Sequence, residues 1–280
     1  MALTAEQIKG RLRNIAKQQH ADARILLRIY MMERFLERVA ASKYNDNFII
    51  KGGMLVTAMV GVSMRSTMDI DTSLKHENLD EEGISRIITE IVAIDLEDDI
   101  LFAIKEISQV MDEMEYPGIR IALDAKIGGM TVPLKIDIST GDVVTPREIR
   151  YEFPMILEER KIPLWSYNLE TILGEKIQTV LNRGILNTRM RDFYDIHILI
   201  KVYGSQISEA VLKAAYEATA KKRETTELLG RAEEILSIVE GDEHMIGLWK
   251  AYCKKYSYAS GIAYEEVISI ARTVISMIES

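Results

Sequence analysis

The stretch Arg65-Ser66-Thr67-Met68-Asp69-Ile70-Asp71 contains two carboxylates, Asp69 and Asp71, that are separated by a single residue. Both belong to a predicted strand over residues 68–74. Because successive side chains of a strand point to opposite faces, Asp69 and Asp71 share one face with Ser73. The other face carries Met68, Ile70, Thr72 and Leu74. Carboxylate oxygens are the ligands that Mg²⁺ prefers, so the pair predicts a metal site.

Groups suited to binding phosphate lie upstream of this pair. Residues 48–50 form a short predicted strand, and Gly52-Gly53 ends it in a turn that glycines adopt easily, before a short predicted helix over residues 54–60. The candidate phosphate ligands are Lys51, Gly52, Gly53, Arg65, Ser66 and Thr67. Amides, hydroxyls and cations together with an acidic pair indicate magnesium-dependent nucleotide chemistry.

A third acid comes from a later strand. Three β-rich runs cover residues 102–110, 119–127 and 132–138, with turns predicted at Pro117-Gly118 and Gly128-Gly129. The last two runs predict a hairpin. In the last run, the apolar residues alternate with Lys135 and Asp137, which places this cation and this carboxylate on one polar face. Asp137 is therefore the predicted third metal ligand.

The remaining segments are mostly helical in pattern. Thr4-Ala5-Glu6-Gln7 predicts a capping box. The other helices are expected over residues 21–41, 79–94, 168–183 with Asn168 or Ser166 as cap, 190–203 closed by Gly204, 207–221, 224–239, 242–256 and 262–279. The segment with Pro146, Pro154 and Pro163 has weak periodicity. We predict an α+β fold, with a mixed β-sheet flanked by helices in residues 1–163 and a helical domain in residues 164–280.

Composition excludes several classes of protein. The 280 residues carry a net charge of −8, which argues against a general nucleic-acid coating protein but leaves room for a local basic patch. Cys253 is the only cysteine, so no internal disulfide forms. The sequence contains no run of eighteen apolar residues and no secretory signal, which predicts a cytoplasmic protein without a membrane partner.

Four motifs together resemble a known family. They are Lys51-Gly52-Gly53, the stretch from Arg65 to Asp71, Gly174-Glu175-Lys176, and Arg191-Asp192-Phe193-Tyr194-Asp195. Over about residues 48–200 the chain is similar to the AbiEii/AbiGii nucleotidyltransferase toxins, which look like nucleotidyltransferases of the DNA-polymerase-β type. Relatives in the MenT group add pyrimidine nucleotides to the 3′ end of tRNA and so block aminoacylation. The resemblance implies a bacterial toxin of a phage-defence or toxin–antitoxin system, with an AbiEi-like antitoxin as partner.

The resemblance also assigns roles to residues. It implies metal ligation by Asp69 and Asp71, phosphate contacts from Ser66 and Thr67, and a triphosphate-binding Lys176. The helix containing Arg191, Asp192 and Asp195 would line the cleft, with Asp195 as its functional acid. Arg65 departs from the family pattern, because a glycine commonly precedes the serine. The alternatives are structural: Lys176 as an exposed helix residue paired with Glu175, Arg191 and Asp192 as ion pairs at the start of a helix, and Asp195 as a buried cap or network acid.

The predicted chemistry is transfer of a nucleoside monophosphate from an NTP to an RNA acceptor, most simply a tRNA 3′ end, with two Mg²⁺ ions. Asp69, Asp71 and Asp137 would hold the ions, and Asp137 could help to remove the proton of the attacking hydroxyl. Other possibilities are a protein or small-molecule acceptor, or a noncatalytic NTP-binding module. A rim for tRNA phosphates is predicted from Arg147, Arg150, Arg183, Arg189 and Arg191, whereas Lys221-Lys222-Arg223 is more typical of a solvated helix end.

Overall fold

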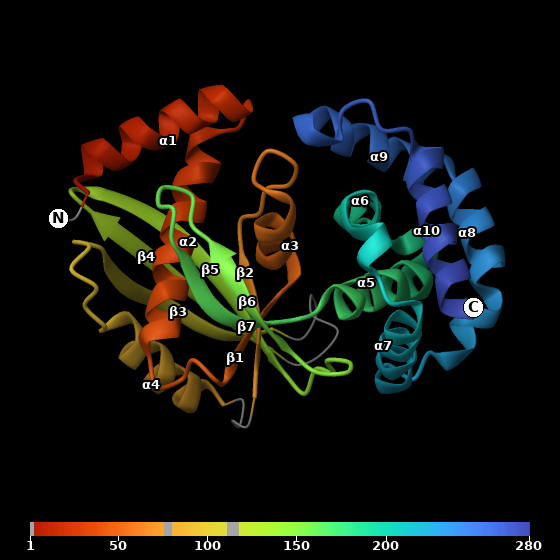
Figure 1. Ribbon diagram of the computed structural model, residues 1–280, viewed down its shortest axis with the longest axis horizontal. Helices are drawn as coiled ribbons and strands as arrows, with labels where there is room; N and C mark the ends of the chain where they lie inside the picture. Colours follow the sequence, from red (N-terminus) through yellow and green to blue (C-terminus); the bar gives the residue numbers. More distant parts are fainter. Residues whose placement is uncertain (1–2, 76–79, 111–117) are drawn as a thin grey trace. The chain divides into compact units, whose positions relative to one another are not determined.

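The computed structural model describes residues 3–75, 80–110 and 118–280 (Figure 1). Its α-helices are α1 (Ala5–Gln19), α2 (Ala23–Ala41), α3 (Gly52–Val60), α4 (Glu81–Val92), α5 (Leu169–Arg183), α6 (Met190–Tyr203), α7 (Glu209–Lys222), α8 (Ala232–Gly241), α9 (Glu243–Lys255) and α10 (Tyr264–Glu279). Its strands are β1 (Phe48–Lys51), β2 (Ile70–Leu74), β3 (Leu101–Val110), β4 (Gly118–Ile127), β5 (Met130–Thr140), β6 (Ile149–Pro154) and β7 (Lys161–Ser166). Short 3₁₀ helices are η1 (Gly184–Leu186), η2 (Gly204–Gln206), η3 (Thr226–Arg231) and η4 (Ser257–Ala259).

The chain forms two compact units. The first contains Met1–Asp142 and Ile149–Ser166, and the second contains Val143–Glu148 and Tyr167–Ser280. The boundary that we expected at residue 164 falls inside β7, and the division into two domains at that point stays a prediction.

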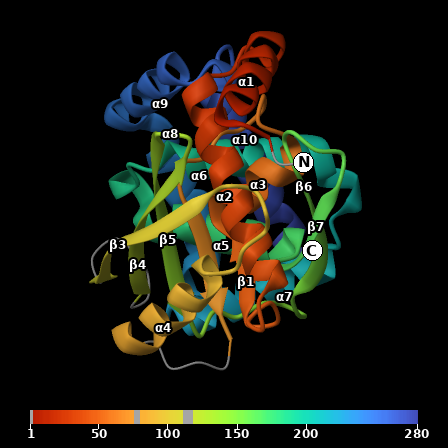
Figure 2. The same cartoon turned by 90° about the vertical axis from the view of Figure 1, so that its left-hand side faces the viewer.

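A seven-stranded mixed sheet forms the first unit, in the order β3-β4-β5-β2-β1-β7-β6 (Figure 2). β2 runs parallel to β5 and β1 runs parallel to β7, whereas the other neighbouring pairs are antiparallel. Helix α2 packs against β5 and β7, and α4 packs against β3. Together with the helical second unit, this sheet confirms the predicted α+β fold.

Alternation decides which side chains of the sheet enter the core. Ile70, Ile136 and Ile138 are completely buried, whereas Asp71 and Asp137 occupy the alternate positions of the same strands. Burying each isoleucine side chain contributes roughly 1.5–3 kcal/mol to folding. The apolar face therefore fixes the register that places the acids on the opposite face.

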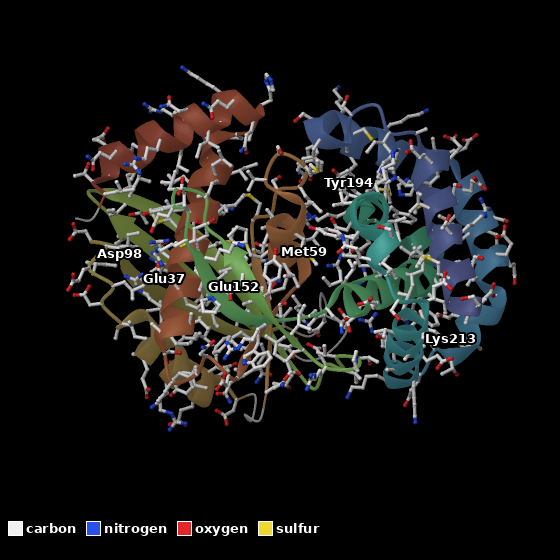
Figure 3. All side chains as sticks on the ribbon, in the orientation of Figure 1. Glu37, Met59, Asp98, Glu152, Tyr194 and Lys213 are labelled. Atoms are coloured by element: carbon white, nitrogen blue, oxygen red, sulfur yellow. The ribbon has the colours of Figure 1, made fainter. Side chains whose placement is uncertain are left out.

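The second unit is helical. Helix α5 packs against α6 and α7, and α10 packs against α6, α7 and α8. Asn168 caps α5, as expected, by accepting a hydrogen bond from the Thr171 amide at 2.8 Å. The ring of Tyr194, labelled in Figure 3, packs against Tyr258 with centroids 4.9 Å apart, and Tyr252 lies next to both. None of the described helices is both long and apolar enough to cross a lipid bilayer.

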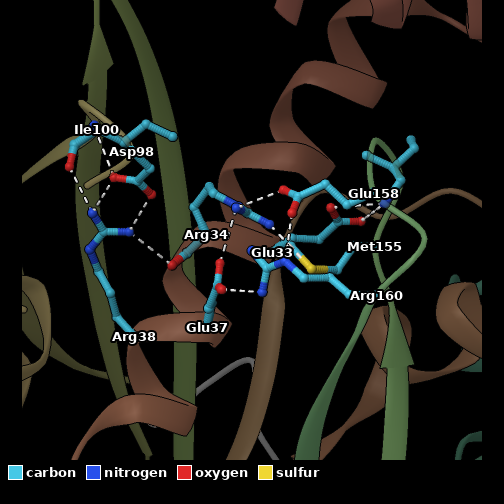
Figure 4. A network of polar contacts seen from close by, with 10 residues as sticks. Glu33, Arg34, Glu37, Arg38, Asp98, Ile100, Met155, Glu158 and Arg160 are labelled. Atoms are coloured by element: carbon cyan, nitrogen blue, oxygen red, sulfur yellow. Dashed lines mark hydrogen bonds and ion pairs between the residues drawn. The ribbon is translucent and has the colours of Figure 1, made fainter. Parts of the chain in front are cut away.

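A polar network ties α2 to the β6–β7 connection and to the segment before β3 (Figure 4). Arg34 contacts Glu37 and Glu158 at 3.0 Å each, and Arg160 contacts the same two carboxylates. Arg38 binds both oxygens of Asp98 and the Ile100 carbonyl. The buried Glu33 accepts a hydrogen bond from the Ile156 amide, 3.1 Å from each carboxylate oxygen. These contacts stay within the first unit.

Several predicted elements are confirmed and one segment is corrected. The capping box at Thr4 forms, and α6 has the predicted bounds, Met190–Tyr203. Residues 149–166 contain two strands where we expected none. On the side of β1, Pro163 is tolerated inside β7 because β1 pairs only with Trp165 and Ser166 further along. The predicted helix start at residue 79 and the predicted turn residue Pro117 lie outside the described residues.

Candidate functional site

Asp71 and Asp137 lie side by side on neighbouring strands. β2 and β5 are parallel, and Asp71 is the register partner of Asp137. Register partners in a sheet point to the same face, so the two carboxylates lie on one face of the sheet. The structure thus brings together two acids that are 66 positions apart in the sequence.

Asp69 joins this pair through a lysine. The Lys135 ammonium lies 3.2 Å from the Asp69 carboxylate and 3.5 Å from the Asp137 carboxylate. Asp69 itself comes one residue before β2 begins, whereas we expected the strand to start at Met68. The cluster nevertheless contains all three predicted acids on one side of the β2–β5 pair.

An arginine from β4 also contacts the cluster. Arg120 binds both oxygens of Asp137, with Nε–Oδ1 at 2.8 Å and Nη2–Oδ2 at 3.1 Å. Arg120 is the register partner of Asp137 across the β4–β5 pair. A bidentate guanidinium–carboxylate pair of this kind fixes the orientation of the carboxylate as well as its charge.

Gly52 and Gly53 lie directly against Asp71. The Gly53 amide donates a hydrogen bond to Asp71 Oδ2 at 3.1 Å. Gly52 has a φ of +59°, and a Cβ atom there would lie 2.2 Å from Asp71 Oδ2. The glycine pair opens helix α3, two residues before the predicted start of that helix, and allows its backbone to approach the acid.

The Arg65-Ser66-Thr67 loop packs on the same glycines. A Cβ atom at Gly53 would lie 2.7 Å from Thr67 Oγ1 and 2.9 Å from Arg65 Nη1. Arg65 is 1% exposed and donates to the Ser66 carbonyl at 2.7 Å, and Thr67 is 2% exposed. Only Ser66 of the three is half-buried. Arg65 and Thr67 are therefore buried in the packing of the loop, and Ser66 is the residue of the three that solvent or a ligand can contact.

Lys51, a predicted phosphate ligand, forms an ion pair with Asp142. Their contact is 2.6 Å, and Ser139 Oγ donates to the same carboxylate oxygen at 2.6 Å. Burial alone would raise the pKa of Asp142, but the charge of Lys51 and hydrogen bonds from Lys51, Ser139 and Ser73 outweigh it and hold the pKa below its ordinary value. Asp142 is thus a stable anion that holds the Lys51 side chain.

Lys176 lies in the second unit, where it contacts two acids of α6. Its ammonium is 2.7 Å from Asp195 and 3.0 Å from Asp192, and Asp195 is completely buried. Both acids come from α6, whereas Lys176 comes from α5. Asp192 and Asp195 act here as ion-pair and buried network acids, as in the alternative that we considered for them, and they fix the position of the Lys176 side chain.

The predicted arginine rim divides between the units. Arg150 belongs to the first unit, pairs with Asp46 at 2.8 Å and stacks over the Trp165 ring at 4.3 Å. The other members are in the second unit, where Arg183 is half-buried and the exposed ones are Arg147, Arg189 and Arg191.

His197 is buried, and burial lowers its pKa, in agreement with a packing role.

The donor chemistry of the acidic cluster suits a hard cation. Over residues 3–75, 80–110 and 118–280, no three His, Cys, Asp or Glu side chains are arranged closely enough to hold a metal together. The Lys135 ammonium nevertheless lies between Asp69 and Asp137, which shows that this position favours positive charge. Oxygen ligands of the correct type for Mg²⁺ are therefore present around a position that attracts a cation.

Three contacts of the site escaped the sequence argument. Arg120, Ser139 and Asp142 were not among the predicted residues, although Arg120 binds Asp137, Asp142 binds Lys51, and Ser139 binds Asp142. Arg120 could have been found from alternation, because it interrupts the buried residues Ile119 and Ile121 on β4. No pattern marks Asp142, which comes after β5 has ended.

Comparison with known proteins identifies the family. Residues 34–268 match the family model described as "Nucleotidyl transferase AbiEii toxin, Type IV TA system". No curated protein matches the chain. JHP933 from Helicobacter pylori matches with a TM-score of 0.47 and 14% identity, over 91% of this chain and 93% of that one. An antigenic nucleotidyltransferase-like protein from Paracoccidioides brasiliensis matches with a TM-score of 0.39 and 16% identity, over 71% of this chain and 90% of that one. Because the family model covers most of the sequence, the chain belongs to the AbiEii family of nucleotidyltransferase toxins.

Proposed function

We propose that this toxin transfers a nucleoside monophosphate from an NTP to an RNA acceptor, most simply the 3′ end of a tRNA. The observation that carries the proposal is the pairing of Asp71 with Asp137 on adjacent parallel strands, with Asp69 beside them and a glycine turn against Asp71. Acids on one face next to a closely approaching backbone suit a reaction on phosphate.

Mg²⁺ is the proposed cofactor, held by Asp69, Asp71 and Asp137. When bound, the metal supplies neutralisation of phosphate charge and lowers the pKa of a coordinated hydroxyl. Asp71 is oriented for this role by the Gly53 amide, and Asp137 is oriented by Arg120. Ser66 has the exposure needed to donate a hydrogen bond to a phosphate oxygen.

Lys176 is the proposed ligand of the triphosphate, and its pairing with Asp192 and Asp195 keeps its charge in place. We further propose that the activity serves phage defence in the bacterial cytoplasm and that an AbiEi-like antitoxin counteracts it. The family membership supports an antitoxin partner.

Labelled NTPs and total tRNA test the proposal. The purified protein is expected to label RNA in the presence of Mg²⁺, and excess EDTA should abolish the labelling. Sequencing of the tRNA 3′ ends then identifies the added base. Label on protein or on a small molecule, with none on RNA, would show that the acceptor is that protein or small molecule and not RNA. NTP binding without transfer to any acceptor would indicate a noncatalytic module.

Gly52→Ala is expected to lower transfer activity by about 10²-fold, because the new Cβ atom must displace Asp71 Oδ2 from a distance of 2.2 Å. The positive φ adds a loss of about 1–2 kcal/mol in the free energy of unfolding. Initial rates and urea unfolding measure the two effects. Gly247→Ala in α9 is the matched control, because nothing lies within 4 Å of its Cβ position. Wild-type activity in Gly52→Ala would show that the position of Asp71 is unimportant.

A further inference from the structure

Helix α1 and the first turns of α2 carry a concentration of positive charge. Residues 3–32 contain two acids, Glu6 and Asp22, and six cations, namely Lys9, Arg11, Arg13, Lys17, Arg24 and Arg28. The chain as a whole has a net charge of −8. This basic segment therefore stands out from an otherwise acidic protein and calls for an anionic partner.

Most of these cations have no carboxylate partner. Within the part of the chain that the structure describes, no ion pair involves Arg11, Arg13, Lys17 or Arg24, and all four are exposed. The arginines further along α2 behave differently, because Arg34 and Arg38 are buried and paired. The first part of α2 thus has positive charge exposed to solvent, whereas the arginines of its later part form buried ion pairs within the fold.

Two of the unpaired cations, Arg13 and Lys17, line a hollow. Gly10, Arg13, Asn14 and Lys17 have the spacing of one helix face, and they line a depression of about 420 Å³ together with Ala16, Ala21 and Ala23. Gly10 leaves one end open, since nothing lies within 4 Å of its Cβ position. The alanines form a small apolar floor, so a phosphate-bearing strand could lie between Arg13 and Lys17 without steric conflict.

The same basic segment contacts the residue that precedes Asp69. Arg28 Nη1 lies 3.5 Å from Met68 Sδ, and Met68 directly precedes Asp69. Both residues belong to the first unit, where α1 and α2 meet (Figure 1). A polyanion on the first turns of α2 would therefore lie next to the loop that carries Met68 and Asp69.

We propose that the face formed by Arg13, Lys17 and Arg24 binds the phosphate backbone of the RNA acceptor, an inference that rests on the proposed function. Arginine, lysine and amide side chains such as Asn14 are the usual ligands of RNA phosphates and sugars. A membrane surface is disfavoured because the apolar residues of α1, Ile8 and Leu12, are buried, whereas an interfacial helix exposes them.

This face also lies apart from the region that defines the family. The family match begins at residue 34, so α1 and the first part of α2 precede it. The matched region contains the acidic cluster and therefore the proposed chemistry. Binding of the RNA phosphate backbone by α1 and the first part of α2 would therefore add a contact with the acceptor outside the matched region.

The test is the triple variant R13Q/K17Q/R24Q, compared with R86Q/K126Q/K161Q. Both variants remove three exposed cations of the first unit, but the second set lies on α4, β4 and β7. Fluorescence anisotropy with labelled tRNA in metal-free buffer measures binding without turnover. The first variant is expected to bind tRNA at least about tenfold more weakly, with a salt dependence reduced by roughly two to three phosphate contacts. The control variant should keep both values near wild type.

Steady-state kinetics adds a second readout. The first variant should raise KM for tRNA and leave KM for NTP unchanged, because its substitutions do not touch the acidic cluster. Equal tRNA affinity and salt slope in the two variants would overturn the proposal. So would binding of the wild type to anionic vesicles or to an acidic peptide, rather than to tRNA, through these three cations. A wild type that transfers nothing to RNA would refute the proposed function itself, which separates the two failures.

Discussion

Asp71→Asn is expected to lower the rate of nucleotidyl transfer by about 10³-fold, which corresponds to roughly 4 kcal/mol of transition-state stabilisation. Asparagine has nearly the same shape as aspartate and keeps an oxygen that can accept the hydrogen bond from the Gly53 amide. It lacks the negative charge that a metal ion requires. The fold should be preserved, because the Asp71 carboxylate is not part of the apolar core.

Transfer to tRNA under single-turnover conditions measures this effect, with circular dichroism to confirm folding. Asp124→Asn is the matched control, since Asp124 lies on β4 of the same sheet and pairs only loosely with Lys105, at 3.8 Å. The control should retain wild-type activity. Added Mg²⁺ should raise the thermal midpoint of the wild type and of the control, but not that of Asp71→Asn. An active Asp71→Asn protein would remove Asp71 from the proposed metal site.

Local patterns were sufficient where one residue type controls the structure. The cap at Asn168, the capping box at Thr4 and the end of α6 at Gly204 all follow from short-range hydrogen bonding. Strand alternation likewise placed Asp71 and Asp137 on the polar faces of their strands. What alternation could not supply is the order of strands, and that order makes these two acids neighbours.

Long-range pairing explains what the sequence did not predict. β6 and β7 were not expected because prolines interrupt this segment, although the buried residues of β7 alternate; the antiparallel pairing of Ile149–Pro154 with Lys161–Ser166 forms the two strands. Long-range contacts also explain why two residues of the site were not predicted. Arg120 binds Asp137 on a neighbouring strand, and Asp142 binds Lys51, which is far from it in the sequence. Burial of Arg65 was also unexpected, since a cation in a loop is usually solvated.

Glu33 lies in a network whose charges balance only when its carboxyl group is protonated. The network contains three arginines and four acids, namely Arg34, Arg38, Arg160, Glu33, Glu37, Glu158 and Asp98. Burial raises the pKa of Glu33 from 4.5 to about 8, and the Ile156 amide and the charge of Arg34 oppose that shift only in part. The folded protein therefore holds a proton here that the unfolded chain releases above pH 4.5.

The sign of the pH effect follows from this difference. A raised pKa in the folded state stabilises the fold fully below about pH 4.5, and that contribution is lost as the pH rises through about 8. Glu33→Gln keeps a neutral group, and its amide oxygen can still accept from the Ile156 amide. We therefore expect the variant to be more stable than the wild type at pH 8.5, by on the order of 4 kcal/mol, and nearly equal to it at pH 4.5.

Urea unfolding of both proteins at several pH values from 4.5 to 8.5 measures the difference. Between these limits the free energy of unfolding of the wild type should fall relative to the variant by about 1.4 kcal/mol per pH unit. Glu106→Gln, on the exposed side of β3, removes a surface carboxylate and serves as the comparison. A difference between Glu33→Gln and wild type that stays constant with pH would mean that Glu33 is already ionised in the fold, held by Arg34. A difference that grows with pH shows that the connection between β6 and β7 is held to α2 through a protonated acid.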